Sequence, residues 1–371
     1  MKILLAFDKF KNCLSAIAVC QIIAKQINLN TSHSYISLPL SDGGEGFLST
    51  INSIKKTVVK NYNVTGPLKK KISVPIGFVD NHIAIVDLST IVGLHLLPKE
   101  KRNPMYTTTK GLGEAIKFAI ENCVDEIWLG VGGSSTNDAA AGALQELGMR
   151  FLDENNSTID NIVGKDLIRI NKIDDSNFVL NKHSVKIKIF CDVRNPMIGN
   201  FGASKTYANQ KGANKNEIEL LENGMQNFIK KATWFCGKDY SDLAGTGAAG
   251  GIAGGFLFFC NAELLNGFDS IAKIIGLEKI IENSDLILTG EGKYDSQSKF
   301  GKVPHSVACL AKKYNKKVYL LAGMIQQVED LKLFDSVNSV FELAASEDDS
   351  IENARGYLIK IINSLILKKM I

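Results

Sequence analysis

The sequence lacks the features of a secreted protein, of a protein stabilised by structural zinc, and of a membrane-spanning protein. Its seven cysteines lie far apart, and no two of them form a C-x-x-C pair. Neither a disulfide framework nor a structural zinc site is therefore expected. The sequence contains no run of about 18 apolar residues, so no transmembrane helix is predicted. The apolar run Met1–Phe7 is shorter than a signal peptide requires. We therefore expect a reducing, cytoplasmic location.

The excess of one sign of charge is also small. The chain has 43 Lys and Arg against 39 Asp and Glu, for a net charge of +4, and its lysine runs are short. A nucleic-acid-binding protein usually has a concentrated basic stripe, so neither a nucleic acid nor a membrane is expected as a partner. The sequence contains no G-x-x-x-x-G-K-[ST], H-R-D, D-F-G or G-x-S-x-G motif. P-loop enzymes and protein kinases are thus excluded, and a nucleophile elbow is absent.

The pattern of apolar segments predicts an α/β protein of two domains, as 371 residues usually form. Strand–loop–helix units occupy both ends of the chain, as in Ile3–Phe7 with the helix after Ser15, and in Leu286–Thr289 with Val303–Tyr314. Short strands with turn residues fill the middle, where antiparallel pairing is plausible. We therefore predict a doubly wound, flavodoxin-like α/β domain made from residues 1–65 plus 285–371, and a second α/β domain, 66–284, inserted in it.

Glycines cluster beside carboxylates at the predicted ends of strands, where ligands of open α/β sheets bind. The first cluster follows a strand and precedes a helix, and it contains Asp42, Gly43, Gly44 and Glu45. Its backbone N–H groups could approach an anion closely, or it could be a tight turn capped by the aspartate. The second cluster runs from Gly130 to Asp138 at the end of a buried strand, and its candidate residues are Gly133, Ser134, Ser135, Thr136, Asn137 and Asp138. It could form a cradle for phosphate or a hydroxy acid, or simply cap a helix.

Three further clusters carry candidate groups. Asp192 and Arg194 follow a predicted strand, and Lys211 stands in a Gln-Lys-Gly-Ala segment; alternatively these residues form a turn with a surface lysine. A formal G-x-G-x-x-G contains Gly247 and Gly250, but no buried strand precedes it, which argues against a dinucleotide site. The last cluster follows a strand and contains Gly290, Glu291, Gly292 and Asp295. Carboxylates near phosphate usually require Mg²⁺, which prefers oxygen ligands, although a capped turn is the alternative.

Taken together, the order and spacing of these segments resemble the bacterial type-2 glycerate kinase family from end to end. The resemblance is carried by the segments Asp8–Ala16, Asp42–Gly46, Val64–Leu68, Thr107–Glu114, Gly132–Asp138, Asp192–Ala213, Gly247–Gly251 and Thr289–Gln297. It implies a kinase that transfers the γ-phosphoryl group of ATP to D-glycerate, giving ADP and 2-phosphoglycerate, with 3-phosphoglycerate as the other possible product. It also implies an active site in the cleft between two α/β domains, with Mg²⁺ required and ATP as co-substrate.

Roles can be assigned as hypotheses within this resemblance. Asp192 is the candidate to orient or deprotonate the substrate hydroxyl, and Asp295 and Glu291 are the candidate Mg²⁺ ligands. Lys9, Lys11 and Lys211 would neutralise phosphate and carboxylate charge. The chain departs from the usual family pattern at Phe7, Asn12, Ala139, Asn209 and Lys293. Two alternatives stay open, a kinase of a related hydroxy acid and a non-catalytic ligand sensor, and the chain could be a monomer or a homodimer.

Overall fold

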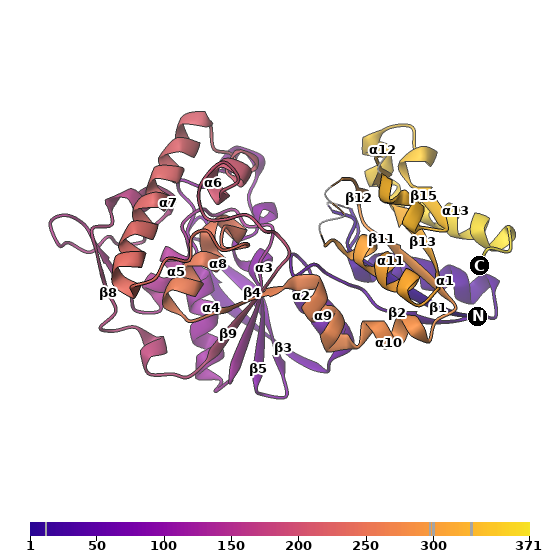
Figure 1. Ribbon diagram of the computed structural model, residues 1–371, viewed down its shortest axis with the longest axis horizontal. Coiled ribbons are helices and arrows are strands. Elements are labelled where there is room, and N and C mark those ends of the chain that lie inside the picture. Colours follow the sequence, from indigo (N-terminus) through magenta and orange to yellow (C-terminus); the bar gives the residue numbers. More distant parts are fainter. Residues whose placement is uncertain (12, 297, 299–300, 327–328) are drawn as a thin grey trace. The chain divides into compact units, whose positions relative to one another are not determined.

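The computed structural model describes residues 1–11, 13–296, 298, 301–326 and 329–371 (Figure 1). The chain forms two compact units. The terminal unit contains Met1–Asp42, Ser49–Ile54 and Gly267–Ile371, and the central unit contains Gly43–Leu48 and Lys55–Asn266. Each unit has its own sheet and its own hydrophobic core.

The terminal unit is built on a parallel sheet in the order β15-β13-β11-β1-β2. Its strands are β1 (Lys2–Phe7), β2 (Ser34–Ser37), β11 (Leu286–Gly290), β13 (Lys317–Ala322) and β15 (Ser336–Ser339). After β1 the chain adds β2 on one side of β1. It later adds β11 on the other side of β1, and β13 and β15 follow outward from β11. The strand order therefore reverses between β1 and β11, and such a switch point is the usual ligand site of an open α/β sheet.

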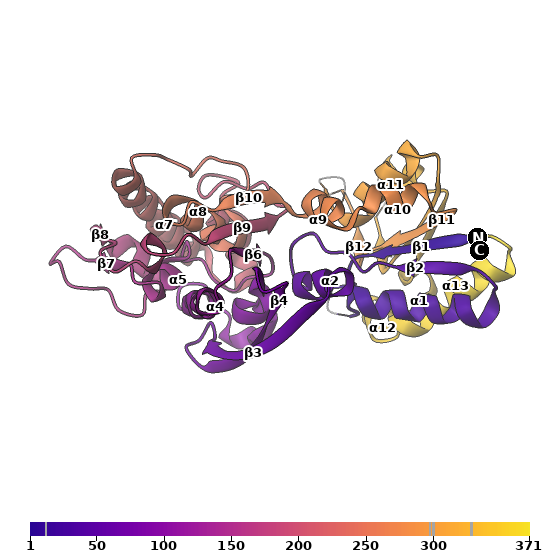
Figure 2. The same cartoon turned by 90° about the horizontal axis from the view of Figure 1, so that it is seen from below.

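Helices cover both faces of this sheet, as a doubly wound domain requires (Figures 1 and 2). The side chains of Ile3 and Leu5 pack with α1 (Ala16–Asn30) and α13 (Ala354–Leu367), while Leu4 and Ala6 face the other layer. That layer contains α9 (Gly267–Ile275), α10 (Leu277–Glu282) and α11 (Val303–Lys313). This division follows from the alternation of side chains along a strand. Among the residues that the structure describes, the terminal unit also contains α12 (Glu347–Glu352), the short strands β12 (Lys293–Tyr294) and β14 (Met324–Ile325), η7 (Glu329–Leu333) and η8 (Phe341–Leu343).

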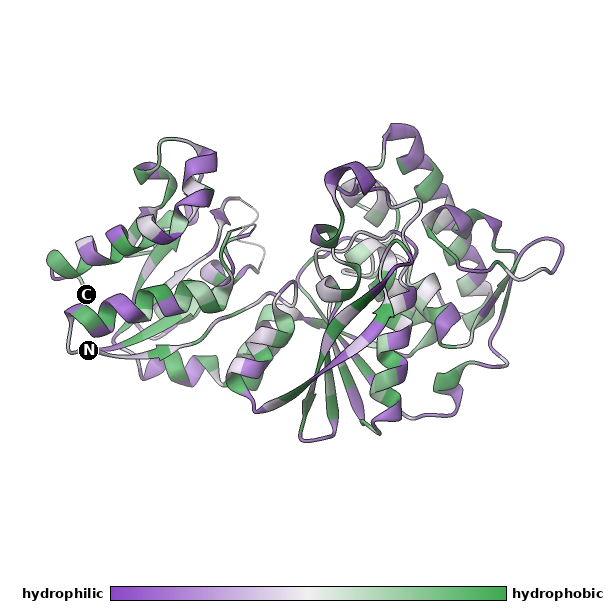
Figure 3. Cartoon of the chain, turned by 180° about the vertical axis from the view of Figure 1, so that it is seen from behind, coloured by the Kyte–Doolittle hydropathy of each residue, from purple (hydrophilic) through white to green (hydrophobic). Residues whose placement is uncertain are grey.

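The central unit contains a mixed sheet in the order β10-β9-β6-β5-β4-β3. The strands are β3 (Thr57–Thr65), β4 (Lys71–Val79), β5 (Ile83–Asp87), β6 (Glu126–Gly130), β9 (Lys186–Cys191) and β10 (Glu263–Asn266). The first three pair antiparallel, which confirms the antiparallel pairing expected there, and the last three continue from β5 in parallel. In Figure 3 the strands show both hydrophobic and hydrophilic stretches. The inner strands β5 and β6 are almost entirely buried, whereas most of the edge strand β3 is exposed.

Helices and short turns complete the central unit. Its helices include α3 (Leu88–Val92), α4 (Lys110–Glu121), α5 (Ala141–Glu146), α6 (Ala203–Tyr207), α7 (Lys215–Cys236) and α8 (Ala248–Phe259), and α2 (Phe47–Ile54) begins in it. The segment between α5 and β9 contains a small antiparallel pair, β7 (Arg150–Leu152) with β8 (Lys172–Asp174). Short 3₁₀ turns are η1 (Leu94–Leu96), η2 (Lys99–Lys101), η3 (Gly164–Arg169), η4 (Val179–Asn181) and η5 (Asn209–Lys211).

The boundaries of the two units differ from those predicted from the sequence. The prediction placed residues 1–65 and 285–371 in one domain and residues 66–284 in the other. Residues Thr57–Thr65 pair along their whole length with β4 and so join the central sheet. The segment 267–284 contains α9 and α10, whose Phe268, Leu277 and Ile281 pack in the core of the terminal unit. In the part of the chain that the structure describes, no helix is both long enough and apolar enough to cross a membrane.

Candidate active site

The switch point of the terminal unit brings two of the predicted segments together. Phe7 at the end of β1 lies opposite Gly290 at the end of β11. Beyond this pair, the N–H of Asp8 donates to the carbonyl oxygen of Gly290 at 2.9 Å, and the N–H of Gly292 donates to that of Lys9 at 3.2 Å. Two hydrogen bonds therefore hold the chain after β1 beside the chain after β11.

Glycine is required at Gly292 and Gly290 because other backbone segments lie against them. A Cβ atom on Gly292 would stand 2.8 Å from the backbone nitrogen of Lys11, and one on Gly290 would stand 1.7 Å from the carbonyl oxygen of Leu321. Neither approach leaves room for a side chain. The close contact at Gly292 brings the backbone of the predicted phosphate-binding Lys11 to the segment that carries Glu291.

Asp8 is a buried carboxylate at this edge, with only 6% of its surface exposed. Burial, together with the nearby carboxylates of Asp42 and Glu291, raises the pKa of Asp8 to about 7 against the opposing charge of Lys9. Its pKa thus lies where a carboxyl group can both accept and release a proton near neutral pH. Sequence reasoning gave Asp8 no role, although its position directly after a buried strand was a usable signal.

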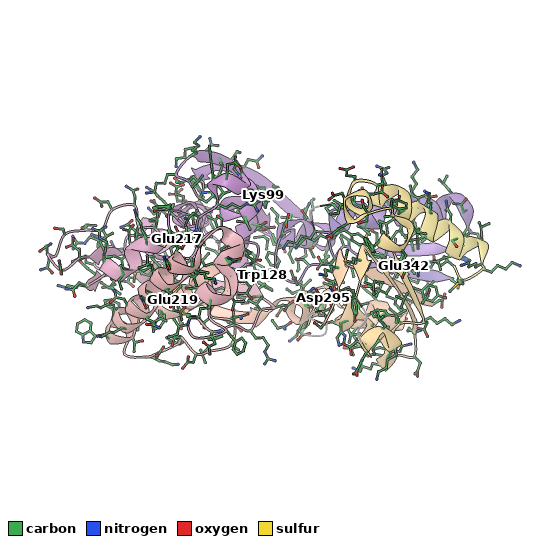
Figure 4. All side chains as sticks on the ribbon, turned by 90° about the horizontal axis from the view of Figure 1, so that it is seen from above. Lys99, Trp128, Glu217, Glu219, Asp295 and Glu342 are labelled. Carbon is green, nitrogen blue, oxygen red and sulfur yellow. The ribbon has the colours of Figure 1, made fainter. Side chains whose placement is uncertain are left out.

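Glu291 and Asp295 share a cation within the protein. The ammonium of Lys302 lies 3.2 Å from Glu291 Oε2 and 3.7 Å from Asp295 Oδ1, and the Ser298 hydroxyl donates to Glu291 Oε1 at 2.6 Å. Burial raises the pKa of Glu291, while Lys302 and Ser298 oppose that rise. Figure 4 labels Asp295 in the terminal unit. Lys302 was not among the predicted site residues, although its place next to Gly301 at the start of α11 was visible in the sequence.

The donor set fits a magnesium ion. Mg²⁺ is commonly held by one or two carboxylates, with water and substrate phosphate completing its shell. Glu291 and Asp295 supply the oxygens and already lie beside a positive charge. Among the residues that the structure describes, no three His, Cys, Asp or Glu side chains form a preassembled metal cluster. A site completed by phosphate does not require one.

In the central unit, a second edge gathers the ends of three parallel strands. Gly130 of β6 lies opposite Phe190 of β9, and the next N–H, that of Val131, donates to Phe190 O at 3.1 Å. Asp192, which is half-buried, follows directly after β9. At the end of β5, Asp87 Oδ2 accepts the N–H of Gly46 at 2.9 Å. The predicted base Asp192 therefore stands at the edge where the central strands end.

The first glycine cluster lies on this edge. A Cβ atom on Gly43 would be 2.7 Å from the carbonyl oxygen of Phe190, and one on Gly132 would be 2.7 Å from the Cα atom of Gly44. The 43–46 turn, which also carries the half-buried Glu45, is thus packed directly on the ends of β6 and β9. Backbone N–H groups at such a turn can approach an anion more closely than side chains would allow.

The second cluster is mostly buried. Gly132 is half-buried and Gly133 is exposed, whereas every residue from Ser134 to Asp138 is at most 4% exposed. The hydroxyl and N–H of Ser135 both donate to Val92 O at 2.8 Å, and Asn137 Nδ2 donates to Ser204 Oγ at 3.1 Å. The accessible part of the cluster is therefore the Gly132–Gly133 turn.

Lys211 and Asp138 are both buried, at 3% and 0% exposure. Lys211 Nζ donates to Ser134 Oγ at 2.9 Å and to the carbonyl oxygen of Thr136 at 2.7 Å. Burial lowers the pKa of Lys211 to about 7, against the attraction of Asp138. Burial also raises the pKa of Asp138 to about 6, against its hydrogen bonds from Thr109 and Gly142.

The remaining candidates lie on neighbouring segments. The N–H of Gly247 donates to Asn195 O at 2.9 Å, and a Cβ atom on Gly250 would lie 2.1 Å from Thr136 O. Both glycines thus allow α8 to approach other backbone closely. Arg194 is exposed, two residues beyond Asp192, and Asn12 lies outside the described residues. The ligand-binding roles assigned to these positions stay predictions.

The sequence of this chain is similar to those of known proteins over almost its whole length. The model of the glycerate kinase family matches residues 3–368. The chain belongs to the glycerate kinase family. This confirms the resemblance predicted from the sequence. Two of its family relatives are the glycerate kinase of Haemophilus influenzae, 37% identical over 92% of this chain and 91% of the relative, and the glycerate 2-kinase of Escherichia coli, 37% identical over 96% and 94%.

A solved structure supports the same assignment. The crystal structure of a protein assigned as glycerate kinase 2 from Salmonella typhimurium LT2 superposes with a TM-score of 0.80 at 34% sequence identity, and the match covers 100% of both chains. The predicted α/β fold class is thereby confirmed for this glycerate kinase family member.

Proposed function

We propose that this chain is an ATP-dependent glycerate kinase that transfers the γ-phosphoryl group of ATP to D-glycerate and yields ADP and 2-phosphoglycerate. The observation that carries the proposal is the family match over residues 3–368, which includes every acidic and glycine-rich segment described above. The relative named glycerate 2-kinase in Escherichia coli supports 2-phosphoglycerate as the product. No observation favours a sensor or a kinase of a different acid.

The terminal unit is proposed to bind the phosphates. Phosphoryl transfer depends on positioning and on neutralising charge, with little covalent chemistry by the protein. Lys9 and Lys11 would neutralise phosphate charge beside the Gly290–Gly292 backbone. Glu291 and Asp295 would hold Mg²⁺, which neutralises phosphate charge when bound. On this proposal Lys302, now shared by the two carboxylates, contributes a further positive charge.

The central unit is proposed to supply groups that bind and activate the acceptor hydroxyl. Asp192 would orient this hydroxyl or accept its proton, and Arg194 would attract the substrate carboxylate. The 43–46 turn and the Gly132–Gly133 turn would offer backbone N–H groups to negatively charged oxygens. Asp8 is a second candidate proton acceptor because its pKa lies at about 7.

A coupled assay of ADP release tests the proposal. Purified protein is mixed with ATP, Mg²⁺ and D-glycerate, and separate controls contain L-glycerate, glycerol or no acceptor. Turnover that requires both D-glycerate and Mg²⁺ is expected, and ³¹P NMR of the product then distinguishes 2- from 3-phosphoglycerate. Folded protein that binds ATP but releases no ADP with D-glycerate would overturn the proposal in favour of another acceptor or a sensor.

The two candidate proton acceptors can be separated by matched variants. Asp192→Asn and Asp8→Asn each remove one carboxylate with little change of shape. We expect Asp192→Asn to lower kcat by about 10²- to 10⁴-fold, the usual contribution of general base catalysis. A near-native kcat for Asp192→Asn, together with such a loss for Asp8→Asn, would transfer the assignment to Asp8.

The cellular location proposed is the cytoplasm. The seven cysteines, all within the described residues, form no disulfide, and Cys20 and Cys191 are buried. Cysteines that form no disulfide suit a reducing compartment, which supports the proposal.

A further inference from the structure

Lys211 connects two segments of the central unit that are distant in the sequence. It ends the short turn η5, and its ammonium makes hydrogen bonds with Ser134 Oγ at 2.9 Å and with the carbonyl oxygen of Thr136 at 2.7 Å. The α6–η5 segment adds a third bond to the same loop, from Asn137 Nδ2 to Ser204 Oγ at 3.1 Å. Three hydrogen bonds therefore connect the α6–η5 segment to the loop after β6.

The same ammonium is shielded from solvent. Lys211 is 3% exposed, Ser134 is 4% exposed and Thr136 is 0% exposed. A buried lysine is costly unless it makes compensating hydrogen bonds, and two such bonds bind it to the loop. A phosphate in solution would meet the Gly132–Gly133 turn rather than this ammonium.

The position of Lys211 is fixed by the residue that follows it. Gly212 has φ +99°, and a Cβ atom added there would lie 2.0 Å from the carbonyl oxygen of Arg102. The backbone after Lys211 is thus pressed against the 102 peptide in a conformation that favours glycine. To reach a ligand outside, the Lys211 side chain would therefore have to move without help from its backbone, and its ammonium would lose both hydrogen bonds to the loop.

We propose that Lys211 is a positioning residue of the kinase, whose buried ammonium fixes the Gly132–Gly133 turn at the end of β6 and does not itself bind the phosphates. This inference rests on the proposed function, because it assigns that turn to the substrate site. It replaces the sequence-based role for Lys211, in which the lysine neutralised phosphate charge.

Hydrogen–deuterium exchange tests the inference without using activity. Lys211→Met keeps the length of the side chain and removes its charge and its donors. We expect faster exchange at residues 131–136 in this variant, with unchanged exchange in α7 and in the terminal unit. Lys205→Met is the matched control, since Lys205 is an exposed lysine on the neighbouring helix α6, and it should leave exchange in 131–136 unchanged. Unaltered exchange at 131–136 in Lys211→Met would overturn the inference.

Kinetics then separate positioning from direct binding. A misplaced turn is expected to reduce kcat/KM by about 10- to 100-fold, with Lys211→Arg recovering part of the loss. In a double-mutant cycle, adding Ser134→Ala to Lys211→Met should cost little more, because both changes release the same loop. Additive losses with a rise confined to the KM for ATP would instead show that the ammonium binds phosphate directly. Should Lys211→Met not fold, the exchange measurement is made on Lys211→Arg and Ser134→Ala, and native exchange at 131–136 in both would equally overturn the inference.

The exchange result also stands apart from the proposed function. If the wild-type protein does not phosphorylate D-glycerate, the kinase proposal fails, while faster exchange at 131–136 still shows that Lys211 fixes the turn.

Discussion

Thr109 donates both its backbone N–H and its hydroxyl to one carboxylate oxygen of Asp138, at 2.9 and 2.8 Å. The same oxygen lies 3.4 Å from the N–H of Gly142. This buried carboxylate therefore fastens the start of α4 to the segment before α5. Its role in the described structure is to hold the fold of the central unit.

Asp138 should make the central unit less stable as the pH rises through the weakly acidic range. Burial raises the pKa of Asp138 from 3.8 to about 6, so between these values the folded chain holds a proton that the unfolded chain has released. The resulting stability is fully present below about pH 4 and is lost as the pH rises through 6. We expect the loss, relative to Asp138→Asn, to be about 3 kcal/mol.

Tryptophan fluorescence can measure this loss in the central unit alone. Both tryptophans, Trp128 in β6 and Trp234 in α7, belong to that unit, and Figure 4 labels Trp128. Denaturant unfolding of the wild type and of Asp138→Asn is compared at pH 4 and pH 7. A difference in unfolding free energy that is the same at both values would contradict the prediction.

The alanines before α5 offer a test of backbone strain. Ala139 and Ala140 have φ values of 50° and 63°, in the left-handed region that costs a non-glycine residue roughly 1–2 kcal/mol. Changing either to glycine relieves this cost, and the relief offsets the lost methyl burial and added chain entropy. We expect the unfolding free energy of Ala139→Gly and Ala140→Gly to stay within about 1 kcal/mol of the wild type. Ala141→Gly, inside α5, should cost about 2 kcal/mol, and equal losses at all three positions would refute the argument.

Lys302 is expected to compete with Mg²⁺ for the two carboxylates. Its ammonium lies 3.2 Å from Glu291 Oε2 and 3.7 Å from Asp295 Oδ1, so a metal must displace it. In Lys302→Met the Mg²⁺ concentration for half-maximal activity should fall about fivefold, equivalent to roughly 1 kcal/mol for a partly exposed pair. Lys313→Met removes the same charge farther along α11, where Lys313 pairs with Glu278, and should leave that concentration unchanged. A higher Mg²⁺ requirement in Lys302→Met would reject competition.

Two glycines of similar backbone conformation should respond differently to alanine. Gly212 has φ +99° and its added Cβ would lie 2.0 Å from Arg102 O, whereas Gly237, with φ +71°, has open space around it. Gly237→Ala should therefore cost only the backbone term, about 1 kcal/mol. Gly212→Ala should cost about 1–3 kcal/mol more, because the Arg102 peptide must move. Tryptophan fluorescence during denaturant unfolding measures both, and equal costs would show that this contact is loose.

Much of the fold was predictable because its signals are local. The strand Lys2–Phe7 and the helix capped by Ser15 follow from apolar periodicity and from a hydroxyl that accepts the N–H of Ala18. The unit boundaries were less predictable. Whether the 57–65 strand belongs to one sheet or the other depends on its pairing with β4, and pairing is a long-range property that composition does not encode.

The candidate site was predictable as segments but not as individual contacts. Gly292 and Glu291 stood out because glycines and acids followed a strand. That Lys211 points inward to Ser134, or that Lys302 lies between Glu291 and Asp295, depends on side-chain directions across the fold. A lysine in sequence looks the same whether it faces a phosphate or a buried carbonyl oxygen, so only the structure could distinguish the two.

The pairing of β1 with β11 has a consequence for synthesis of the chain. The hydroxyl of Thr289 donates to the carbonyl oxygen of Ala6 at 2.6 Å across 283 residues of sequence. The central unit, Gly43–Leu48 with Lys55–Asn266, is complete before β11 leaves the ribosome. During most of translation the apolar strand β1 therefore lacks its neighbour β11. Contacts so distant in sequence also form slowly. In a nascent chain halted before residue 286, the central unit could fold and β1 could pair with β2, but the edge of β1 that pairs with β11 would stay open and prone to aggregation. Such a chain would be a natural client for a chaperone.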